Sequence, residues 1–175
     1  MRFNLAPRAA AMLAIGLDIT FKQGRGITWA IGMLAWMGLG LLVANLAPLA
    51  FKKFSKEYLA NFKLWLPEIV LAIGLVYGSY ANPYGNEGGG YGYFMSLVAV
   101  WGFGSFAVFA FSFLVQQKGS QDRKDSVTSG VLGLVLGILY VTAPLGAIPA
   151  VGFLGAYLVI MGVHLGISAA TARKG

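Results

Sequence analysis

The chain has no cysteine and only one histidine among its 175 residues. The absence of cysteine excludes disulfide bridges, thiolate metal sites and thiol nucleophiles, and it leaves the redox compartment open. A single histidine provides no pair of imidazole ligands for haem or a transition metal. We therefore predict neither a metal site nor a cofactor.

Charge is also scarce, because charged side chains make up 11% of the residues and hydrophobic side chains 58%. In soluble domains, roughly a quarter of all residues are charged. A helix needs about 20 apolar residues to cross a bilayer. Five stretches approach or exceed that length: 27–50, 64–81, 93–115, 127–143 and 148–172. Backbone groups in lipid must pair within their own segment, so the predicted fold class is an all-α integral membrane protein.

The N-terminal stretch 5–21 is a less obvious span, because it contains Arg8 and Asp18 around a short apolar centre. A cleaved secretory signal would end in a small-x-small site. The chain instead continues with Asp-Ile-Thr-Phe-Lys from Asp18 onward. We predict that the stretch is retained as a short first helix, with the Arg8 side chain reaching the lipid headgroups.

Glycine-marked apolar segments recur along the chain. One marker occurs at 13–17, 71–75 and 135–139, and a second at 36–40, 101–104 and 160–163. Successive markers lie about 58 to 64 residues apart, the length of a helical hairpin plus a loop. The pattern predicts six transmembrane helices as three repeated hairpins in one membrane domain, 1–175. Its expected parts are repeat 1 at about 5–50, an interfacial linker at 51–63, repeat 2 at about 64–117 and repeat 3 at about 126–172.

Basic residues are distributed unevenly over the predicted loops. Six spans would place Arg2, Arg8, Lys52, Lys53, Lys56, Lys63, Lys118, Arg123, Lys124, Arg173 and Lys174 on the side of the termini, and Lys22 and Arg25 on the other. Excess Lys and Arg mark cytoplasmic loops. We therefore expect a multi-pass protein of a bacterial inner (cytoplasmic-type) membrane with both termini cytoplasmic. This distribution accounts for the net charge of +7 without a nucleic-acid partner.

The predicted linker combines aromatic and basic side chains. Aromatic residues recur there at helical spacing, and lysines lie off that face, a pattern typical of a helix at the interface with anionic lipid headgroups. The expected lipid-interface residues are Lys52, Lys53, Phe54, Lys56, Tyr58, Phe62, Lys63 and Trp65. The segment is either a plain connection resting on the bilayer or a docking surface for a partner.

The chain has 25 glycines, and three pairs are spaced four residues apart on one helix face. They are Gly74 and Gly78, Gly133 and Gly137, and Gly162 and Gly166. Small residues at this spacing let membrane helices approach closely. We predict packing within the bundle, while contact in a homo-oligomer stays open.

Three ionisable residues are predicted at membrane depth, where each is a functional hypothesis by default. Asp18 has Lys22 one turn away, so a local ion pair would satisfy it. Glu68 follows Pro67, and its carboxylate is expected to cap amides at a helix N-terminus. His164 is the only histidine. The alternative is a proton-sensing set, because histidine changes charge between pH 5 and 8.

The last third of the chain resembles the HdeD-like family of bacterial acid-resistance membrane proteins. The resemblance rests on 129–139, Pro144 and 155–162, where spaced glycines, a turn proline and a second glycine-marked helix follow one another. Repeat 1 departs from this pattern, since 22–25 reads Lys-Gln-Gly-Arg where the turn proline would stand. The resemblance implies a membrane protein linked to acid or envelope stress, and it offers no catalytic residues.

We expect no enzymatic activity, because the sequence contains no evident paired carboxylates, nucleophile–base pair or metal cluster. Two other functions stay open. One is a structural or accessory subunit of a larger membrane complex, in contact with lipids or hydrophobic cofactors. The other is a small transporter or channel that uses Asp18, Glu68 or His164.

Overall fold

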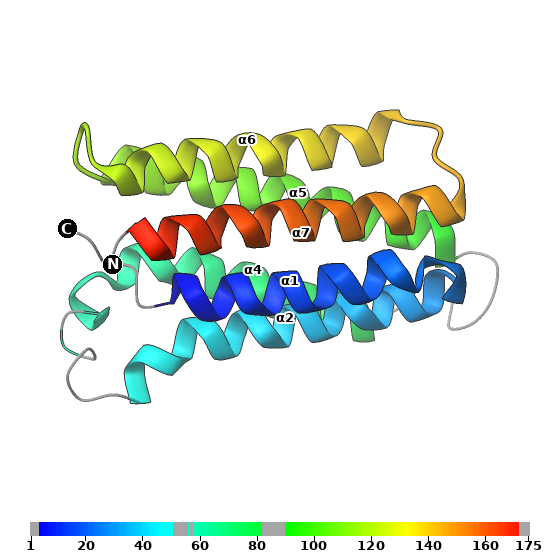
Figure 1. Ribbon diagram of the computed structural model, residues 1–175, viewed down its shortest axis with the longest axis horizontal. Helices are drawn as coiled ribbons and strands as arrows, with labels where there is room; N and C mark the ends of the chain where they lie inside the picture. The colour runs from blue at the N-terminus through cyan, green and yellow to red at the C-terminus, as the bar shows by residue number, and fades with distance from the viewer. Residues whose placement is uncertain (1–3, 51–55, 57, 82–89, 172–175) are drawn as a thin grey trace.

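The computed structural model describes residues 4–50, 56, 58–81 and 90–171. Within this part of the chain the structure is all-helical and contains no strand. The elements are α1 (Leu5–Phe21), the 3-10 turn η1 (Gln23–Arg25), α2 (Ile27–Ala50), α4 (Phe62–Tyr80), α5 (Gly90–Val115), α6 (Gln121–Thr142) and α7 (Ala147–Thr171). The long helices lie side by side, and α1 begins at the same end of the bundle at which α7 finishes (Figure 1). We call this the terminus end.

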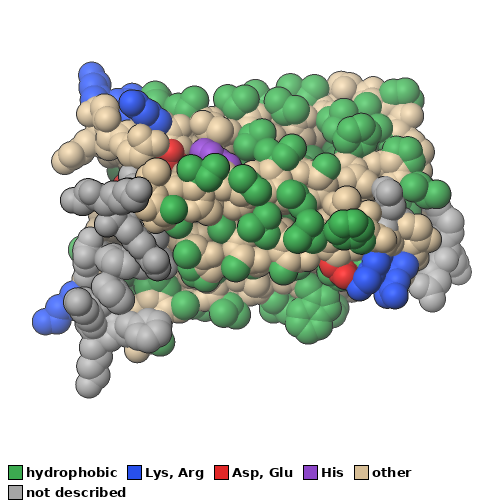
Figure 2. Space-filling model, in the orientation of Figure 1, with side chains coloured by type: hydrophobic (Ala, Val, Ile, Leu, Met, Phe, Trp, Pro, Cys, Tyr) green, Lys and Arg blue, Asp and Glu red, His purple; other side chains and the backbone are tan. Residues whose placement is uncertain are grey.

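Five of the helices, α2 and α4 to α7, are long and apolar enough to cross a membrane. Their outward faces carry exposed hydrophobic side chains, such as Val43, Val70, Val100, Val141 and Ile167. On the face seen in Figure 2, hydrophobic side chains cover the middle of the bundle, and Lys and Arg lie near its ends. Exposed apolar surface of this extent is that of a multi-pass membrane protein. Helix α1 is shorter, with 17 residues.

The closest packing is between helices of different predicted hairpins, not between the two helices of one hairpin. The tightest pairs are α5 with α6 and α1 with α7, followed by α2 with α4. A Cβ atom added at Gly102 of α5 would lie 2.7 Å from the backbone nitrogen of Gly137 on α6. One added at Gly16 of α1 would lie 2.8 Å from the Cβ of Leu158 on α7. Only glycine permits such backbone approaches.

The predicted glycine pairs differ in what they contact. Added Cβ atoms would lie within 3.0 Å of a neighbour at Gly78, Gly133, Gly137 and Gly162. At Gly166 the nearest atom is the Cβ of Ala9 at 3.9 Å, an ordinary contact. Gly74 has nothing within 4 Å, because it lines an apolar groove between α4 and α5. Close packing at Gly74 was therefore a wrong expectation.

Tyrosine hydroxyls close the end of the bundle opposite the termini. Tyr91 donates to the Leu145 carbonyl, Tyr93 to the Gly78 carbonyl and Tyr140 to the Ala150 carbonyl. Each bond joins two different helices or a helix to a neighbouring loop, which fixes the helix ends to one another.

Candidate functional site

A buried ion pair joins helix α1 to helix α4. Nη1 of Arg8 on α1 lies 2.7 Å from Oε2 of Glu68 on α4, and the two side chains are 7% and 13% exposed. The ring of Phe109 on α5 lies 5.9 Å from the guanidinium carbon. Charges in a protein interior require a partner, because desolvation of a lone charge is very costly. Each residue is the other's counter-charge.

Two expectations about these residues were wrong. The Arg8 side chain does not reach for the headgroups, because it turns inward to Glu68. Glu68 does not cap a helix start, because α4 begins at Phe62 and carries Pro67 and Glu68 inside it. Pro67 is the sixth residue of α4, where its missing N–H removes the hydrogen bond to the Lys63 carbonyl, and the helix nevertheless extends back to Phe62.

A second network fixes the chain around this pair. Nδ2 of Asn4 donates to Oδ1 of Asn45 at 2.7 Å, although the two residues are 41 positions apart. The Tyr58 hydroxyl donates to the Asn45 carbonyl at 2.7 Å, and Nε1 of Trp65 donates to the Tyr58 carbonyl at 2.8 Å. The rings of Tyr58 and Trp65 stack with centroids 4.9 Å apart. The start of α1, the end of α2 and the segment before α4 are thus held together.

This network corrects the prediction for the linker. Tyr58 and Trp65 are buried rather than facing lipid, since their polar groups bond to the protein backbone. Phe62, Lys56 and Lys63 are exposed. Lys52, Lys53 and Phe54 lie outside the described residues. Burial raises the pKa of Tyr58 to about 12, and the charge of Glu68 adds to the shift, so the hydroxyl stays a neutral donor at physiological pH.

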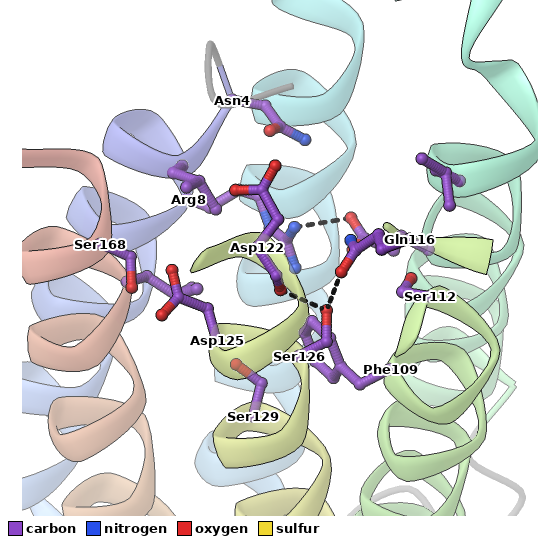
Figure 3. A pocket seen from close by; sticks show the side chains of 14 residues that line it. Asn4, Arg8, Phe109, Ser112, Gln116, Asp122, Asp125, Ser126, Ser129 and Ser168 are labelled. Carbon is purple, nitrogen blue, oxygen red and sulfur yellow. Dashed lines mark hydrogen bonds and ion pairs between the residues drawn. The ribbon is translucent and has the colours of Figure 1, made fainter. Parts of the chain in front are cut away.

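A polar pocket of about 70 Å³ lies beside the ion pair at the terminus end (Figure 3). Side chains from α1, α4, α5, α6 and α7 line it. Among them are Ser112, Asp122, Asp125, Ser126, Ser129 and Ser168. The Ser126 hydroxyl oxygen lies 2.9 Å from the Asp122 carbonyl oxygen and 3.1 Å from Oε1 of Gln116, and either of them can accept its single proton. A buried water needs a cavity of roughly 10–15 Å³ and two to four polar partners, so the pocket suits several waters.

The charges around the pocket are predominantly negative. Glu68, Asp122 and Asp125 line it, with Arg8 as the cation. These are three of the six acidic residues in a chain whose net charge is +7. Carboxylates gathered beside low-dielectric walls favour the entry of cations and protons.

A smaller cavity of about 20 Å³ lies on the far side of the pair and shares Arg8, Glu68 and Phe109 with the pocket. Asn45 and Ser105 are polar residues of its lining, and apolar residues such as Trp101 complete it. The Trp101 ring meets the ring of Tyr157 edge to face at 5.4 Å. The pair thus separates a polar region from a predominantly apolar one.

The three ionisable residues singled out from the sequence do not form one site. Glu68 lies in the pocket. Nε2 of His164, on α7, lies 3.4 Å from the carbonyl oxygen of Asp125, which lines the pocket. Asp18 pairs with Lys22 one turn away at the opposite end of α1, with side chains 31% and 43% exposed.

Sequence reasoning missed the pocket and its cation. Arg8 was placed at the headgroups, and Asp122 and Asp125 were not among the residues singled out. A signal was present in α5, where Ser105 and Ser112 stand seven residues apart and so share one face of an apolar helix. Buried serines on α6 and α7 extend the same polar surface.

Among the described residues, no three His, Cys, Asp or Glu side chains are grouped so that they could hold a metal ion. No protein-family model matches the chain, and neither a curated protein nor a solved structure is significantly similar to it.

Proposed function

We propose that this chain is a six-span protein of a bacterial inner membrane that supports survival in acid without catalysing a reaction. The sequence resemblance to the HdeD-like family and the three glycine-marked hairpins support this proposal. The distribution of basic residues supports a cytoplasmic location for both termini. The exposed Lys56 and Lys63 suit contact with anionic headgroups at that face.

The observation that carries the proposal is the buried Arg8–Glu68 pair beside a polar pocket. A carboxylate gains a proton in acid, whereas a guanidinium keeps its charge at every physiological pH. Protonation of Glu68 therefore leaves a buried cation without its counter-charge, which destabilises the arrangement. Because the pair joins α1 to α4, acid would weaken the contact between these two helices.

The first helix fits this proposal despite its length. Seventeen residues at 1.5 Å per residue give a helix of about 25 Å, a little short of the hydrocarbon thickness of about 30 Å. A short span is accommodated by local thinning of the bilayer. Its two charged residues are paired, Arg8 with Glu68 and Asp18 with Lys22, so neither enters lipid as a lone charge.

The test is acid survival of a bacterial strain that carries this protein natively. Deletion should reduce survival after external acid challenge, and the wild-type protein should restore it. Glu68→Gln should fail to restore it, because the amide takes up no proton. Asp18→Asn is the matched control, since it removes a carboxylate from the exposed pair on the same helix, and it should restore survival fully.

Membrane levels of each variant are measured by immunoblotting, and equal levels are required before rescue is compared. Equal survival of the deletion strain and the wild type would contradict the proposal. Full rescue by Glu68→Gln would show that the ion pair is not its basis.

A further inference from the structure

Apart from Oε2 of Glu68, which pairs with Arg8, two buried polar atoms at the pocket lack partners within the described part of the chain. One is Nε of Arg8, a donor, and the other is Oδ2 of Asp125, an acceptor. Arg8 is 6% exposed, and both residues line the pocket of about 70 Å³. Buried polar atoms are rarely left without a hydrogen bond, and a bridging water is the usual remedy where the cavity is polar and large enough.

The rest of the lining suits the same occupant. Ser112, Ser129 and Ser168 are buried, and each lines the pocket from a different helix. A hydroxyl both donates and accepts, so a ring of serines can bond to water in either orientation. The cavity beyond the pair has a volume of only about 20 Å³, and Met12, Trp101 and Met161 form part of its wall. The volume that can hold a chain of several waters therefore ends at Arg8 and Glu68.

We propose that a chain of waters fills this pocket from the terminus end and carries protons to Glu68 from that side alone. The proposal deepens the proposed function and rests on it. A hydronium ion at the mouth passes its proton along the waters, and an Oε atom of Glu68 receives a proton. Water remains at the mouth, the carboxylate becomes a neutral carboxyl group, and the Arg8–Glu68 pair changes from net zero to +1.

Charged and titratable groups face Glu68 from several elements. Asp122 and Asp125 of α6 line the same pocket. Arg8 of α1 is its ion-pair partner. Tyr58 faces the pair from the segment before α4 and stays neutral. Nε2 of His164 on α7 lies 3.4 Å from the carbonyl oxygen of Asp125. The uncharged Asn45 of α2, Ser112 of α5 and Gln116, which follows α5, also line the two cavities.

The first test uses the absence of native cysteine, which makes any introduced thiol unique. Ser129→Cys places a thiol on the pocket at a residue that is 1% exposed. Ser79→Cys is the control, because Ser79 is 8% exposed and does not line the pocket. A brief pulse of Ag⁺, an ion small enough to follow water, is applied to the protein in bilayers. Thiols left unblocked are then counted with a fluorescent maleimide after denaturation.

Surface exposure alone predicts faster blocking at position 79, whereas the water chain predicts blocking at least 10-fold faster at position 129. The faster reaction should occur with Ag⁺ added on the terminus side. Equal or slower blocking at position 129 would overturn the proposal. Ser112→Cys on α5 repeats the test at a second pocket serine, so that a folding defect in one variant does not decide the result.

The second test follows the proton itself. The protein is reconstituted in one orientation, and the infrared carbonyl band of a protonated carboxyl group is assigned to Glu68 by its loss in Glu68→Gln. The band should grow after acidification on the terminus side and stay constant after acidification on the other. A band that follows the opposite side, or no such band in a folded protein, would overturn the water chain.

These outcomes are separate from those of the acid-survival test. Cells that lose the protein without losing acid survival would remove the biological role and leave the water chain standing. A dry pocket in a protein that does protect cells would overturn the water chain and leave the biological role standing.

Discussion

Helix α1 carries an ion pair at each end, and the two pairs behave as different kinds of structure. Arg8 pairs with Glu68 on another helix, 60 residues further along the chain, and the two side chains are only 7% and 13% exposed. Asp18 finds Lys22 one turn away on the chain, and both side chains are partly exposed. The first pair exists only when the bundle has assembled, whereas the second needs no more than a local helix and its end.

The surroundings of the two pairs differ in the same way. Buried asparagines and serines, together with the partly buried carboxylates of Asp122 and Asp125, surround the Arg8–Glu68 pair. At the opposite end, tyrosine hydroxyls bond to backbone carbonyls and close the bundle. The comparison teaches that the terminus end encloses its charged groups among several helices, whereas at the other end the ion pair stays near the surface and tyrosine hydrogen bonds join the helix ends.

The largest expected effect on stability comes from removing one partner of the Arg8–Glu68 pair. Glu68→Ala leaves Arg8 buried without a counter-charge and should lower the free energy of unfolding by about 3–5 kcal/mol. Chemical unfolding of the protein in detergent, followed by circular dichroism, measures the change. Asp18→Ala is the matched variant at the other end of α1 and should change stability far less.

A double variant sharpens the same comparison. Arg8→Met with Glu68→Leu replaces both charges by apolar groups of similar size and should recover most of the stability lost in Glu68→Ala. If the double variant is as unstable as the sum of the two single variants, the two residues do not act as a pair.

Disturbing a close backbone contact between two helices should lower the stability by less. Gly102→Ala forces a Cβ to within 2.7 Å of the Gly137 backbone nitrogen and should cost about 1–3 kcal/mol. Gly74→Ala enters open space, so it should be neutral or stabilise α4 by up to about 1 kcal/mol through helix propensity. Thermal unfolding in the same detergent compares the two. Equal destabilisation would contradict the packing described for α5 and α6.

Loss of the Tyr58 hydroxyl should lower the free energy of unfolding by a still smaller amount. Tyr58→Phe leaves the Asn45 carbonyl without this donor, a change of about 0.5–1.5 kcal/mol. The pKa of Tyr58 in the folded protein is about 12, above the ordinary value of 10. The stability that the neutral phenol provides is therefore complete below pH 10 and is lost as the pH rises toward 12. An ultraviolet titration should show a tyrosine that ionises near pH 12 in the wild type, and this transition should be absent in Tyr58→Phe.

The smallest effect on stability is expected for the Asp18–Lys22 pair. Asp18→Asn removes a partly exposed ion pair between residues one turn apart, which is worth about 0.3–0.5 kcal/mol. The unfolding midpoint should move by less than for any other destabilising variant, and the difference should vanish in high salt. A loss as large as that of Glu68→Ala would contradict the contrast between the two ends.

The sequence predicts well what depends on neighbouring residues. Long apolar runs gave the helices α2 and α4 to α7, and the spacing of Asp18 and Lys22 agrees with their observed pairing. Contacts between distant segments were not predicted. Arg8 and Glu68 belong to different helices, and only tertiary packing decides whether an arginine near a helix start turns outward to headgroups or inward to a carboxylate.

The same limit applies to Tyr58 and Trp65. Their spacing with other aromatic residues suggested a face against lipid, but a helical face shows only that residues lie together and not what covers them. The Asn45 carbonyl at the end of α2 supplies the hydrogen bond that draws Tyr58 inward. No pattern in the local sequence indicates that partner.

The central claim is that α1 lies within the bundle, packed on α7, so that Arg8 reaches the interior. An added Cβ at Gly166 lies 3.9 Å from the Cβ of Ala9, within the range of about 3.5–4.5 Å for a disulfide. Oxidation of the otherwise cysteine-free Ala9→Cys, Gly166→Cys variant in membranes should therefore link the two helices, and fragments cleaved between them should separate only after reduction. An Ala10→Cys, Gly166→Cys control should not link, because Ala10 is exposed. No link in the first variant would contradict the account.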